Sequence, residues 1–427
     1  MNCFINLYGE KKNLKFYIKT YGCSFNQADS ENIEAFLQKK GHERVESEEK
    51  AEVVIFNTCG VKDSTENRIV NDIKKCGKKI IATGCLVQAQ PDKISVLKKD
   101  ISLVGTFDNI KILDALTSKG VWIRKGLNVP SKPKLNGLVS TIQVSTGCLG
   151  NCTFCQTKLA RGSLKSFDES MIVKNMEWLA EKGCREFRLT SQDLGCYGFD
   201  AGTSLPSLLE KIVEIKGNFK VRLGMMNPEH AIQIKNDLVK FLKNDKIYNF
   251  IHIPVQSGSD AVLEKMNRNY TISEFKELIG FLKSNSKDLT IETDLIVGFP
   301  TESRDDFNET LQLMNEVKFD IVNLSKFSAR KNTPAALMKQ LNKNEIKKRS
   351  VEASAVYKRI SLEKNTEMVG RVEKVTVIEK ARGLMLSRTK SYKPVLVNAE
   401  LGEEFFVKIT SAGQSHLIGE RLLNNEY

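Results

Sequence analysis

The sequence predicts an α/β protein in three parts: an N-terminal open α/β domain with a parallel sheet, a central partial (β/α)6 barrel, and a small C-terminal antiparallel β-barrel. Three observations support this prediction. Short apolar runs alternate with helical patterns near the N-terminus, six more alternate with helical patterns in the middle, and closely spaced short strands fill the end. The expected domains are 13–125, 134–365 and 366–427.

The N-terminal sheet is predicted from three apolar runs, at 14–23, 53–60 and 79–85, which each carry a cysteine beside a glycine at or near their end. Helical patterns at 30–39 and 64–75 separate them. Alternating strand and helix is typical of βαβ units, which build parallel sheets.

Cys23, Cys59 and Cys85 are therefore expected at the carboxyl ends of strands, where open α/β sheets bind their ligands. Three thiolates in one such crevice can hold an iron–sulfur cluster with one open iron. The alternative is three buried structural cysteines, since free cysteine is among the most buried residue types. Four cysteines elsewhere in the chain receive no role: Cys3, Cys76, Cys184 and Cys196.

The partial barrel is predicted from six apolar runs, too few to close an eight-stranded barrel. They lie at 141–145, 186–191, 220–225, 249–255, 291–297 and 320–326. Active sites of such architectures lie at the carboxyl ends of the strands. We expect contacts to a cofactor there from Ser191, Gln192, Asn227, Gln256, Asp294 and Gly298. For any single one of these residues, an ordinary loop position is the alternative.

A second cysteine trio is compact. Cys148, Cys152 and Cys155 follow the strand 140–147 with the spacing C-x3-C-x2-C. These thiolates suit three corners of a cubane cluster, and no fourth cysteine completes the set. A cluster with an open iron is a reaction centre, as is a metal with an open coordination position. The alternative is a zinc knuckle on Cys152 and Cys155, although no second Cys or His pair follows at the usual spacing.

The chain has 65 basic and 52 acidic residues, a net charge of +13, which favours a polyanionic partner. The stretch 330–365 is rich in Lys and Arg and is predicted as a helix; its charged face is either an RNA contact or a solvated surface. Phosphate contacts supply most of the affinity of such surfaces for RNA. On the predicted C-terminal β-barrel, RNA contacts are expected from Lys380, Arg382, Arg388, Lys390 and Lys393.

Membrane and secreted classes are not expected. The chain has no run of 18 apolar residues, and 1–12 lacks the pattern of a secretory signal. Ten cysteines in such a chain indicate metal or redox chemistry rather than disulfides. The expected location is the cytoplasm.

The motifs resemble those of the methylthiotransferase family of radical S-adenosylmethionine (SAM) enzymes over nearly the whole chain. The matching stretches are Thr-Tyr-Gly-Cys-Ser-Phe-Asn at 20–26, Asn-Thr-Cys at 57–59, Thr-Gly-Cys-Leu-Val-Gln at 83–88, Pro-Val-Gln-Ser-Gly-Ser at 254–259 and Asp-Leu-Ile-Val-Gly-Phe-Pro at 294–300. Residues 147–162, 189–193 and 333–336 are similar to the archaeal and eukaryotic branch. Leu159 and Lys331-Asn332 depart from that pattern without touching a cluster ligand.

The resemblance implies methylthiolation at C2 of N6-threonylcarbamoyladenosine at position 37 of tRNA, with SAM and two [4Fe-4S] clusters as cofactors. The compact trio would hold the cluster that cleaves SAM. Cys23, Cys59 and Cys85, the dispersed trio, would hold the cluster that donates sulfur, and a second SAM would supply the methyl group. The implied partners are the anticodon stem-loop, bound partly by a TRAM-like C-terminal domain, and an electron donor protein. The alternatives are isopentenyladenosine or a ribosomal protein as substrate, a radical SAM enzyme of another reaction type with an accessory cluster, or a non-catalytic RNA-binding protein that carries zinc or a cluster.

Overall fold

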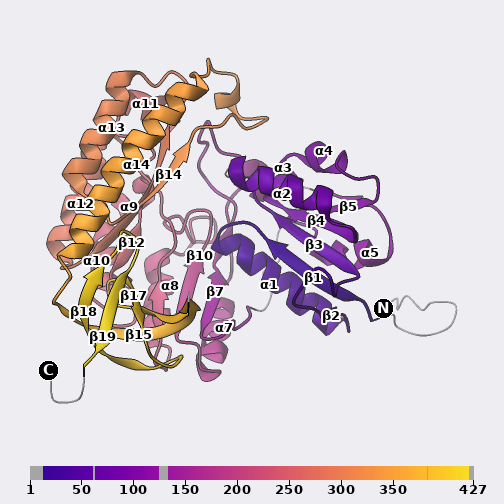
Figure 1. The fold of residues 1–427 in the computed structure, drawn as a ribbon, viewed down its shortest axis with the longest axis horizontal. Coiled ribbons are helices and arrows are strands. Elements are labelled where there is room, and N and C mark those ends of the chain that lie inside the picture. Colours follow the sequence, from indigo (N-terminus) through magenta and orange to yellow (C-terminus); the bar gives the residue numbers. More distant parts are fainter. Residues whose placement is uncertain (1–12, 61–62, 125–132, 382, 423–427) are drawn as a thin grey trace. The chain divides into compact units, whose positions relative to one another are not determined.

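The computed structural model describes residues 13–60, 63–124, 133–381 and 383–422. The chain divides into two compact units (Figure 1). The first comprises Met1–Lys134 and Gln156–Gly162, and the second comprises Leu135–Cys155 and Ser163–Tyr427. None of the helices in these described ranges has both the length and the apolar character that crossing a bilayer requires.

The first unit is built on a parallel six-stranded sheet of order β2-β1-β3-β4-β5-β6. The strands are β1 (Lys15–Thr20), β2 (Glu43–Arg44), β3 (Val53–Thr58), β4 (Lys79–Gly84), β5 (Ile101–Val104) and β6 (Val121–Trp122). The helices are α1 (Ser24–Lys39), α2 (Asp63–Lys75), α3 (Cys85–Ala89), α4 (Pro91–Ser95), η1 (Asn109–Lys111), α5 (Ile112–Thr117) and α6 (Thr157–Arg161).

Strand β3 shows why this sheet reads as continuous apolar runs. Val54 and Phe56 pack in one buried cluster with residues of α2, α3 and α4, while Val53 and Ile55 pack in another with residues of α1 and α5. All six residues of β3 are buried. Helices on both faces of a parallel sheet remove the polar alternation that a half-exposed strand would show.

The second unit holds six parallel strands in two sheets of three, β11-β10-β7 and β12-β13-β14. Isolated bridges between Val221 and Ile247 and between Met225 and His252 connect the two sheets into an open partial barrel. The strands are β7 (Val139–Gln143), β10 (Glu186–Thr190), β11 (Lys220–Arg222), β12 (Phe250–His252), β13 (Thr290–Val297) and β14 (Ile321–Lys326); β8 (Ser145–Thr146) and β9 (Lys165–Ser166) pair separately.

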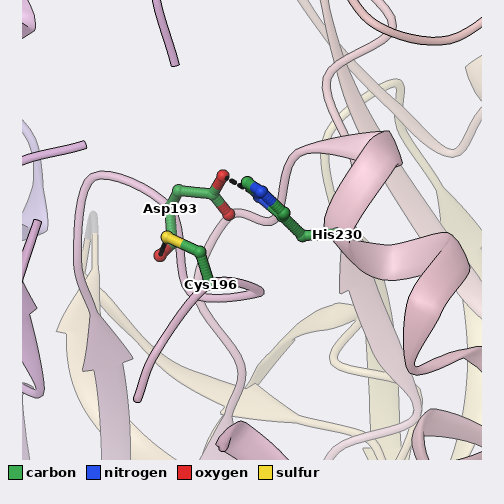
Figure 2. Close-up of side chains that lie close together, drawn as sticks. All are labelled: Asp193, Cys196 and His230. Carbon is green, nitrogen blue, oxygen red and sulfur yellow. Dashed lines mark hydrogen bonds and ion pairs between the residues drawn. The ribbon is translucent and has the colours of Figure 1, made fainter. Parts of the chain in front are cut away.

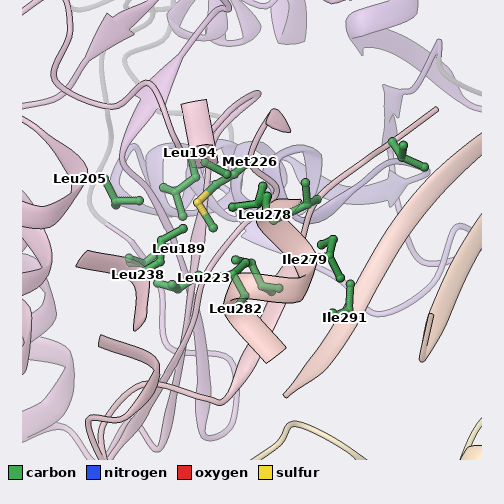
Figure 3. Close-up of a cluster of buried hydrophobic side chains, with 14 of the residues drawn as sticks. Leu189, Leu194, Leu205, Leu223, Met226, Leu238, Leu278, Ile279, Leu282 and Ile291 are labelled. Carbon is green, nitrogen blue, oxygen red and sulfur yellow. The ribbon is translucent and has the colours of Figure 1, made fainter. Parts of the chain in front are cut away.

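Helices cover the partial barrel and share one buried apolar cluster with its strands. Figure 3 shows part of it, with Leu189 after the middle of β10 beside Leu223, and Leu278 and Leu282 reaching in from α12. The helices are α7 (Glu169–Glu181), α8 (Leu205–Glu214), α9 (Pro228–Gln233), α10 (Lys235–Leu242), α11 (Asp260–Lys265), α12 (Ile272–Asn285), α13 (Arg304–Val317) and α14 (Lys343–Thr366).

Two of the six predicted strands are shorter than expected. The strand predicted at 249–255 ends at His252, because Pro254 has no N–H to donate to a ladder. The strand predicted at 220–225 ends at Arg222, and beyond it the chain meets its neighbour only through the isolated bridge at Met225.

The helix predicted over 330–365 begins only at Lys343. Asn342 caps it by accepting a hydrogen bond from the Asn344 N–H at 2.8 Å, while Pro334 begins the short 3-10 turn η2 (Pro334–Ala336). Arg349 is buried and pairs with Glu302 at 2.6 Å, so the basic helix is partly a structural element.

The C-terminal strands form a closed barrel of order β15-β16-β17-β19-β18. They are β15 (Val372–Ala381), β16 (Leu384–Arg388), β17 (Pro394–Val397), β18 (Glu404–Ala412) and β19 (Leu417–Arg421). The barrel is not wholly antiparallel as predicted, because β17 and β19 are parallel. Five strands cannot alternate direction around a closed ring, so at least one parallel pair is required.

Candidate cluster sites

The dispersed cysteine trio lies at one edge of the first unit's sheet. Cys23 directly precedes α1 beyond the end of β1, Cys59 follows β3, and Cys85 begins α3 directly after β4. Strands β1, β3 and β4 are parallel neighbours, so their carboxyl ends and these thiols share one edge. Cys59 is buried, Cys85 is half-buried and Cys23 is exposed.

Two buried asparagines tie the strand ends of this edge together. The Asn26 side-chain N–H donates to Asn57 Oδ1 at 2.5 Å, and the Asn57 side-chain N–H groups donate to the Asn26 carbonyl and to Ser30 Oγ, both at 2.8 Å. Asn57 ends two residues before Cys59, and Asn26 follows Cys23 by three. This network holds two of the thiol-bearing loops against each other.

The third loop depends on Gly84, whose φ is +94°. A Cβ there would lie 2.3 Å from the Thr58 carbonyl oxygen, so no side chain fits. The Thr58 hydroxyl donates to the Thr83 carbonyl at 2.5 Å and fixes the same pair of strand ends. The Thr-Gly-Cys sequence therefore sets the direction in which Cys85 enters the edge.

Arg161, at the end of α6, reaches this edge and was not predicted as a site residue. Its side chain is 2% exposed, Nε donates to Cys85 Sγ at 3.3 Å, and Nη2 pairs with Asp29 Oδ2. The guanidinium also lies 4.7 Å from the centre of the Phe25 ring. Burial raises the pKa of the Cys85 thiol, while the Arg161 charge and hydrogen bond oppose this and favour the thiolate, the form that binds metals.

The compact trio lies in the loop that follows β8. The Gly150 N–H donates to Cys148 Sγ at 3.3 Å, and a Cβ on Gly150 would lie 3.5 Å from Cys148 Sγ and 3.7 Å from Cys152 Sγ. Burial raises the pKa of Cys148 to about 12, and Asp193 and the thiols of Cys155 and Cys152 raise it as well. A buried thiol with a raised pKa beside two further cysteines suits a cationic metal centre, which would deprotonate it.

Arg268 is the counterpart of Arg161 in the second unit, and no sequence pattern identified it. Nη1 donates to Cys152 Sγ at 3.2 Å, Nη2 to Asn227 Oδ1 at 2.5 Å and to the Pro254 carbonyl at 3.2 Å, and Nε to the Tyr270 hydroxyl at 3.2 Å. Every nitrogen of this guanidinium therefore has an acceptor. Arg268 joins the compact trio to Asn227, which was predicted as a SAM contact.

A second group of polar side chains lies beyond the ends of β10 and β11. Figure 2 shows the Asp193 carboxylate facing the His230 ring, with Oδ2 and Nδ1 2.7 Å apart. Asp193 Oδ1 accepts from the backbone N–H groups of Gly195 at 3.1 Å and Asn227 at 3.0 Å, and the Cys196 thiol donates to the Asp193 carbonyl at 3.3 Å.

These three side chains offer ligand atoms within 4.8 Å of one another, but each already has a hydrogen-bond partner. Burial lowers the pKa of His230, but the hydrogen bond to Asp193 and the negative charges of Asp193 and Glu229 together outweigh burial, so this pKa lies above its usual value. We therefore interpret this group as structural, because Asp193 fixes the backbone of Asn227. Sequence reasoning found neither His230 nor a role for Cys196.

Two further predicted cofactor contacts follow β10. Gln192 Oε1 accepts the Gly147 N–H at 2.7 Å and so holds the turn that precedes Cys148. The Ser191 hydroxyl is buried and has no hydrogen-bond partner among the residues that the structure describes. An orphaned buried hydroxyl next to Gln192, which holds the candidate cluster loop, fits an acceptor or donor that a bound molecule would supply.

Of the remaining predicted contacts, Gln256 follows β12, Asp294 lies within β13 and Gly298 directly follows β13. Gln256 has φ +70° and its backbone N–H donates to the Asp294 carbonyl at 2.9 Å. Asp294 Oδ1 lies 3.1 Å from His252 Nε2 and accepts from the Asn323 side chain at 2.8 Å. A Cβ on Gly298 would lie 2.5 Å from Ile346 Cγ1, so packing against α14 explains this glycine without a ligand.

The predicted RNA-binding residues do not share one environment. Lys380 is exposed, Arg382 lies outside the described residues, and Arg388 is half-buried over the Tyr392 ring, 4.2 Å from its centre. The Lys390 ammonium donates to two carbonyls of the central barrel, those of Asn244 and Ile247. Burial, aided by Lys220, lowers the pKa of Lys390 to about 8.

Lys393 is buried as well and is bound within the unit. Its ammonium pairs with Asp320 at 2.8 Å and donates to Asn365 at 3.1 Å. The structure therefore uses Lys390 and Lys393 to join the small barrel to the central one, and a role of either in RNA binding stays a prediction.

Comparisons with known proteins bear on both units. Residues 15–105 match the model of an uncharacterized protein family, UPF0004, and residues 142–314 match that of the radical SAM superfamily. The chain is 40% identical over 423 residues to a probable threonylcarbamoyladenosine tRNA methylthiotransferase of Archaeoglobus fulgidus, covering 95% of this chain and 98% of that protein. A threonylcarbamoyladenosine tRNA methylthiotransferase of Xenopus laevis is 36% identical over 431 residues, covering 95% and 77%.

Solved structures are similar in fold. A radical SAM methyltransferase of Kitasatospora setae, TsrM, solved with its tryptophan substrate and a SAM analogue, superposes with a TM-score of 0.56 at 12% identity. The match covers 76% of this chain and 75% of that one. At this identity the likeness supports the architecture alone.

Proposed function

Because this chain belongs to the radical SAM family of threonylcarbamoyladenosine tRNA methylthiotransferases, we propose that it methylthiolates C2 of N6-threonylcarbamoyladenosine at position 37 of tRNA. The product is the 2-methylthio derivative. The observation that carries the proposal is the 40% identity over 95% of the chain. Two cysteine trios, each at strand ends within its own unit, agree with it.

An iron–sulfur cluster and SAM are the cofactors of the radical SAM domain. We assign one [4Fe-4S] cluster to Cys148, Cys152 and Cys155 and a second to Cys23, Cys59 and Cys85, since each trio supplies three thiolates and leaves one iron open. When bound, these groups supply the electron that cleaves SAM, the sulfur that replaces the inert C2–H hydrogen, and the SAM methyl group.

The chain itself positions these groups and excludes water. Gln192 holds the turn before the compact trio, and Arg268 holds Cys152 and Asn227 in one hydrogen-bonded group. We retain Ser191 and Asn227 as SAM contacts, because one has an orphaned buried hydroxyl and the other is fixed beside a cluster ligand. Gln256, Asp294 and Gly298 would shape the same strand ends.

For tRNA, the proposed contact is the anticodon stem-loop, whose unpaired bases can be splayed into a pocket. Lys380 and Arg388 on the TRAM-like segment 366–427 and the exposed lysines of α14, such as Lys347 and Lys358, would face its phosphates. The segments 13–125 and 134–365 would carry the sulfur-donating and radical SAM clusters. An electron donor protein and a cytoplasmic location complete the proposal.

The test is nucleoside mass spectrometry on tRNA that carries N6-threonylcarbamoyladenosine, after anaerobic incubation with reconstituted protein, SAM, sulfide and reductant. We expect the 2-methylthio derivative to form. SAM cleavage without that nucleoside would move the substrate to isopentenyladenosine or a ribosomal protein. A verified cluster that does not cleave SAM would exclude the enzyme and leave a cluster-bearing RNA-binding protein.

A further inference from the structure

Arg161 is a fully charged side chain buried in the first unit, and its burial needs an explanation. The side chain is 2% exposed. Removing a guanidinium from water is costly unless it is paired and hydrogen-bonded. The protein meets this cost in part with Asp29, 4% exposed, whose Oδ2 accepts from Nη2, and with the face of Phe25.

The second direct contact of this guanidinium is a predicted cluster ligand. Nε donates to Cys85 Sγ at 3.3 Å, whereas the other polar groups at this edge bond to one another or to the backbone. Asp29 lies on α1, six residues after Cys23. Arg161 therefore connects the helix that follows one ligand of the trio with the sulfur of another.

The third nitrogen, Nη1, is buried and has no hydrogen-bond partner in the part of the chain that the structure describes. Buried donors without acceptors are rare in native proteins. Arg268 makes the contrast plain, because each of its nitrogens has an acceptor within the second unit. The described residues of the first unit thus do not fully satisfy this cation, which lies beside the Cys85 thiol, a group that becomes anionic when it binds metal.

We infer that Arg161 is a positioning residue for the sulfur-donating cluster: it holds the Cys85 sulfur by a hydrogen bond and compensates the negative charge that the loaded trio carries. The inference rests on the proposed assignment of a cluster to Cys23, Cys59 and Cys85. Hydrogen bonds to sulfur and net charge are the protein's main means of setting the reduction potential of such a cluster. Both stabilise the more negative, reduced form, so Arg161 raises that potential.

The experiment uses the full chain with Cys148, Cys152 and Cys155 changed to Ala, so that only the dispersed trio can hold a cluster. The midpoint potential is measured by redox titration with electron paramagnetic resonance, alongside iron content. In this background Arg161→Met should lower the potential, with at least a tenfold loss in the equilibrium for reduction, or about 59 mV for a one-electron couple. Arg161→Lys keeps the charge but loses the planar guanidinium. Its midpoint potential should lie between those of the background protein and Arg161→Met.

Arg44→Met is the matched control, because Arg44 forms a more exposed ion pair with Glu34 in the same unit. The midpoint potential of the cluster should not change in this variant. If loss of the ion pair with Asp29 prevents Arg161→Met from folding, Asp29→Asn with Arg161→Met keeps the net charge of the pair and should show a smaller fall in potential, due to the lost hydrogen bond to Cys85. An unchanged potential at full iron content would overturn the inference alone. A background protein that binds no cluster would instead contradict the proposed function.

Discussion

The two cysteine trios present one kind of ligand set on two different scaffolds. Cys148, Cys152 and Cys155 come from one loop of the second unit, whereas the dispersed trio comes from three strand ends of the first. Among the described residues, an arginine donates to a cysteine sulfur of each trio: Arg268 to Cys152, and Arg161 to Cys85. Local spacing in the sequence brings the cysteines of the compact trio together, whereas the order of strands in a sheet brings those of the dispersed trio together.

The largest effect is expected from a substitution in the compact trio. Cys152→Ala removes a ligand of the radical SAM cluster and should abolish both SAM cleavage and the methylthiolated nucleoside, measured by chromatography and mass spectrometry. Cys184→Ala is the control, since Cys184 is a buried cysteine of the same unit outside both trios. Continued SAM cleavage by the Cys152 variant would show that the loop does not hold the catalytic cluster.

A change in the dispersed trio should separate SAM cleavage from methylthiolation. Cys59→Ala should spare part of the SAM cleavage, because the compact trio is intact. It should abolish methylthiolation, because the sulfur source is lost. Cys76→Ala serves as control, with Cys76 buried in the first unit away from the trio. Normal product from the Cys59 variant would remove the second cluster from the mechanism.

Backbone strain at the sheet edge should have a smaller effect. Gly84→Ala combines a φ of +94° with a contact 2.3 Å from the Thr58 carbonyl, and should destabilise the first unit by about 3 kcal/mol. Gly41→Ala has a similar φ of +90° but open space, so it should cost only about 1 kcal/mol. Chemical denaturation and iron content measure both effects; equal losses would show that the carbonyl contact is not what requires glycine.

The smallest effect is expected in the second unit at Lys390, between β16 and β17 of the small C-terminal barrel. Its pKa is about 8 in the folded chain, below the usual value of 10.5, so folding disfavours the charged form. The resulting cost is complete below pH 8 and disappears as the pH rises toward 10.5. The stability of Lys390→Met relative to the wild type should therefore fall by roughly 1 kcal/mol, after allowance for solvent, as the pH rises from 7 to 10. A pH-independent difference in denaturation midpoints would contradict this assignment.

Much of the architecture was accessible from patterns in the sequence. Strands β10, β13 and β14 lie within a residue of their predicted bounds, because an apolar run between polar segments marks a buried parallel strand. Helix α14 was predicted thirteen residues too long at its start, since basic composition continues through a segment in which Pro334 forms a 3-10 turn. The parallel pairing of β17 with β19 follows from closure of the barrel, which no local pattern records.

The candidate sites divide in the same way. Sequence by itself determined the compact trio and the placement of Cys23, Cys59 and Cys85 at strand ends, because spacing and strand order are properties of the chain. Only the tertiary structure decided that Lys393 is buried against Asp320, and that Arg161 and Arg268 reach cysteine sulfurs. A long cationic side chain looks the same in sequence whether it ends in water or in a buried ion pair. Its partner comes from a distant part of the chain, and packing alone brings the two together.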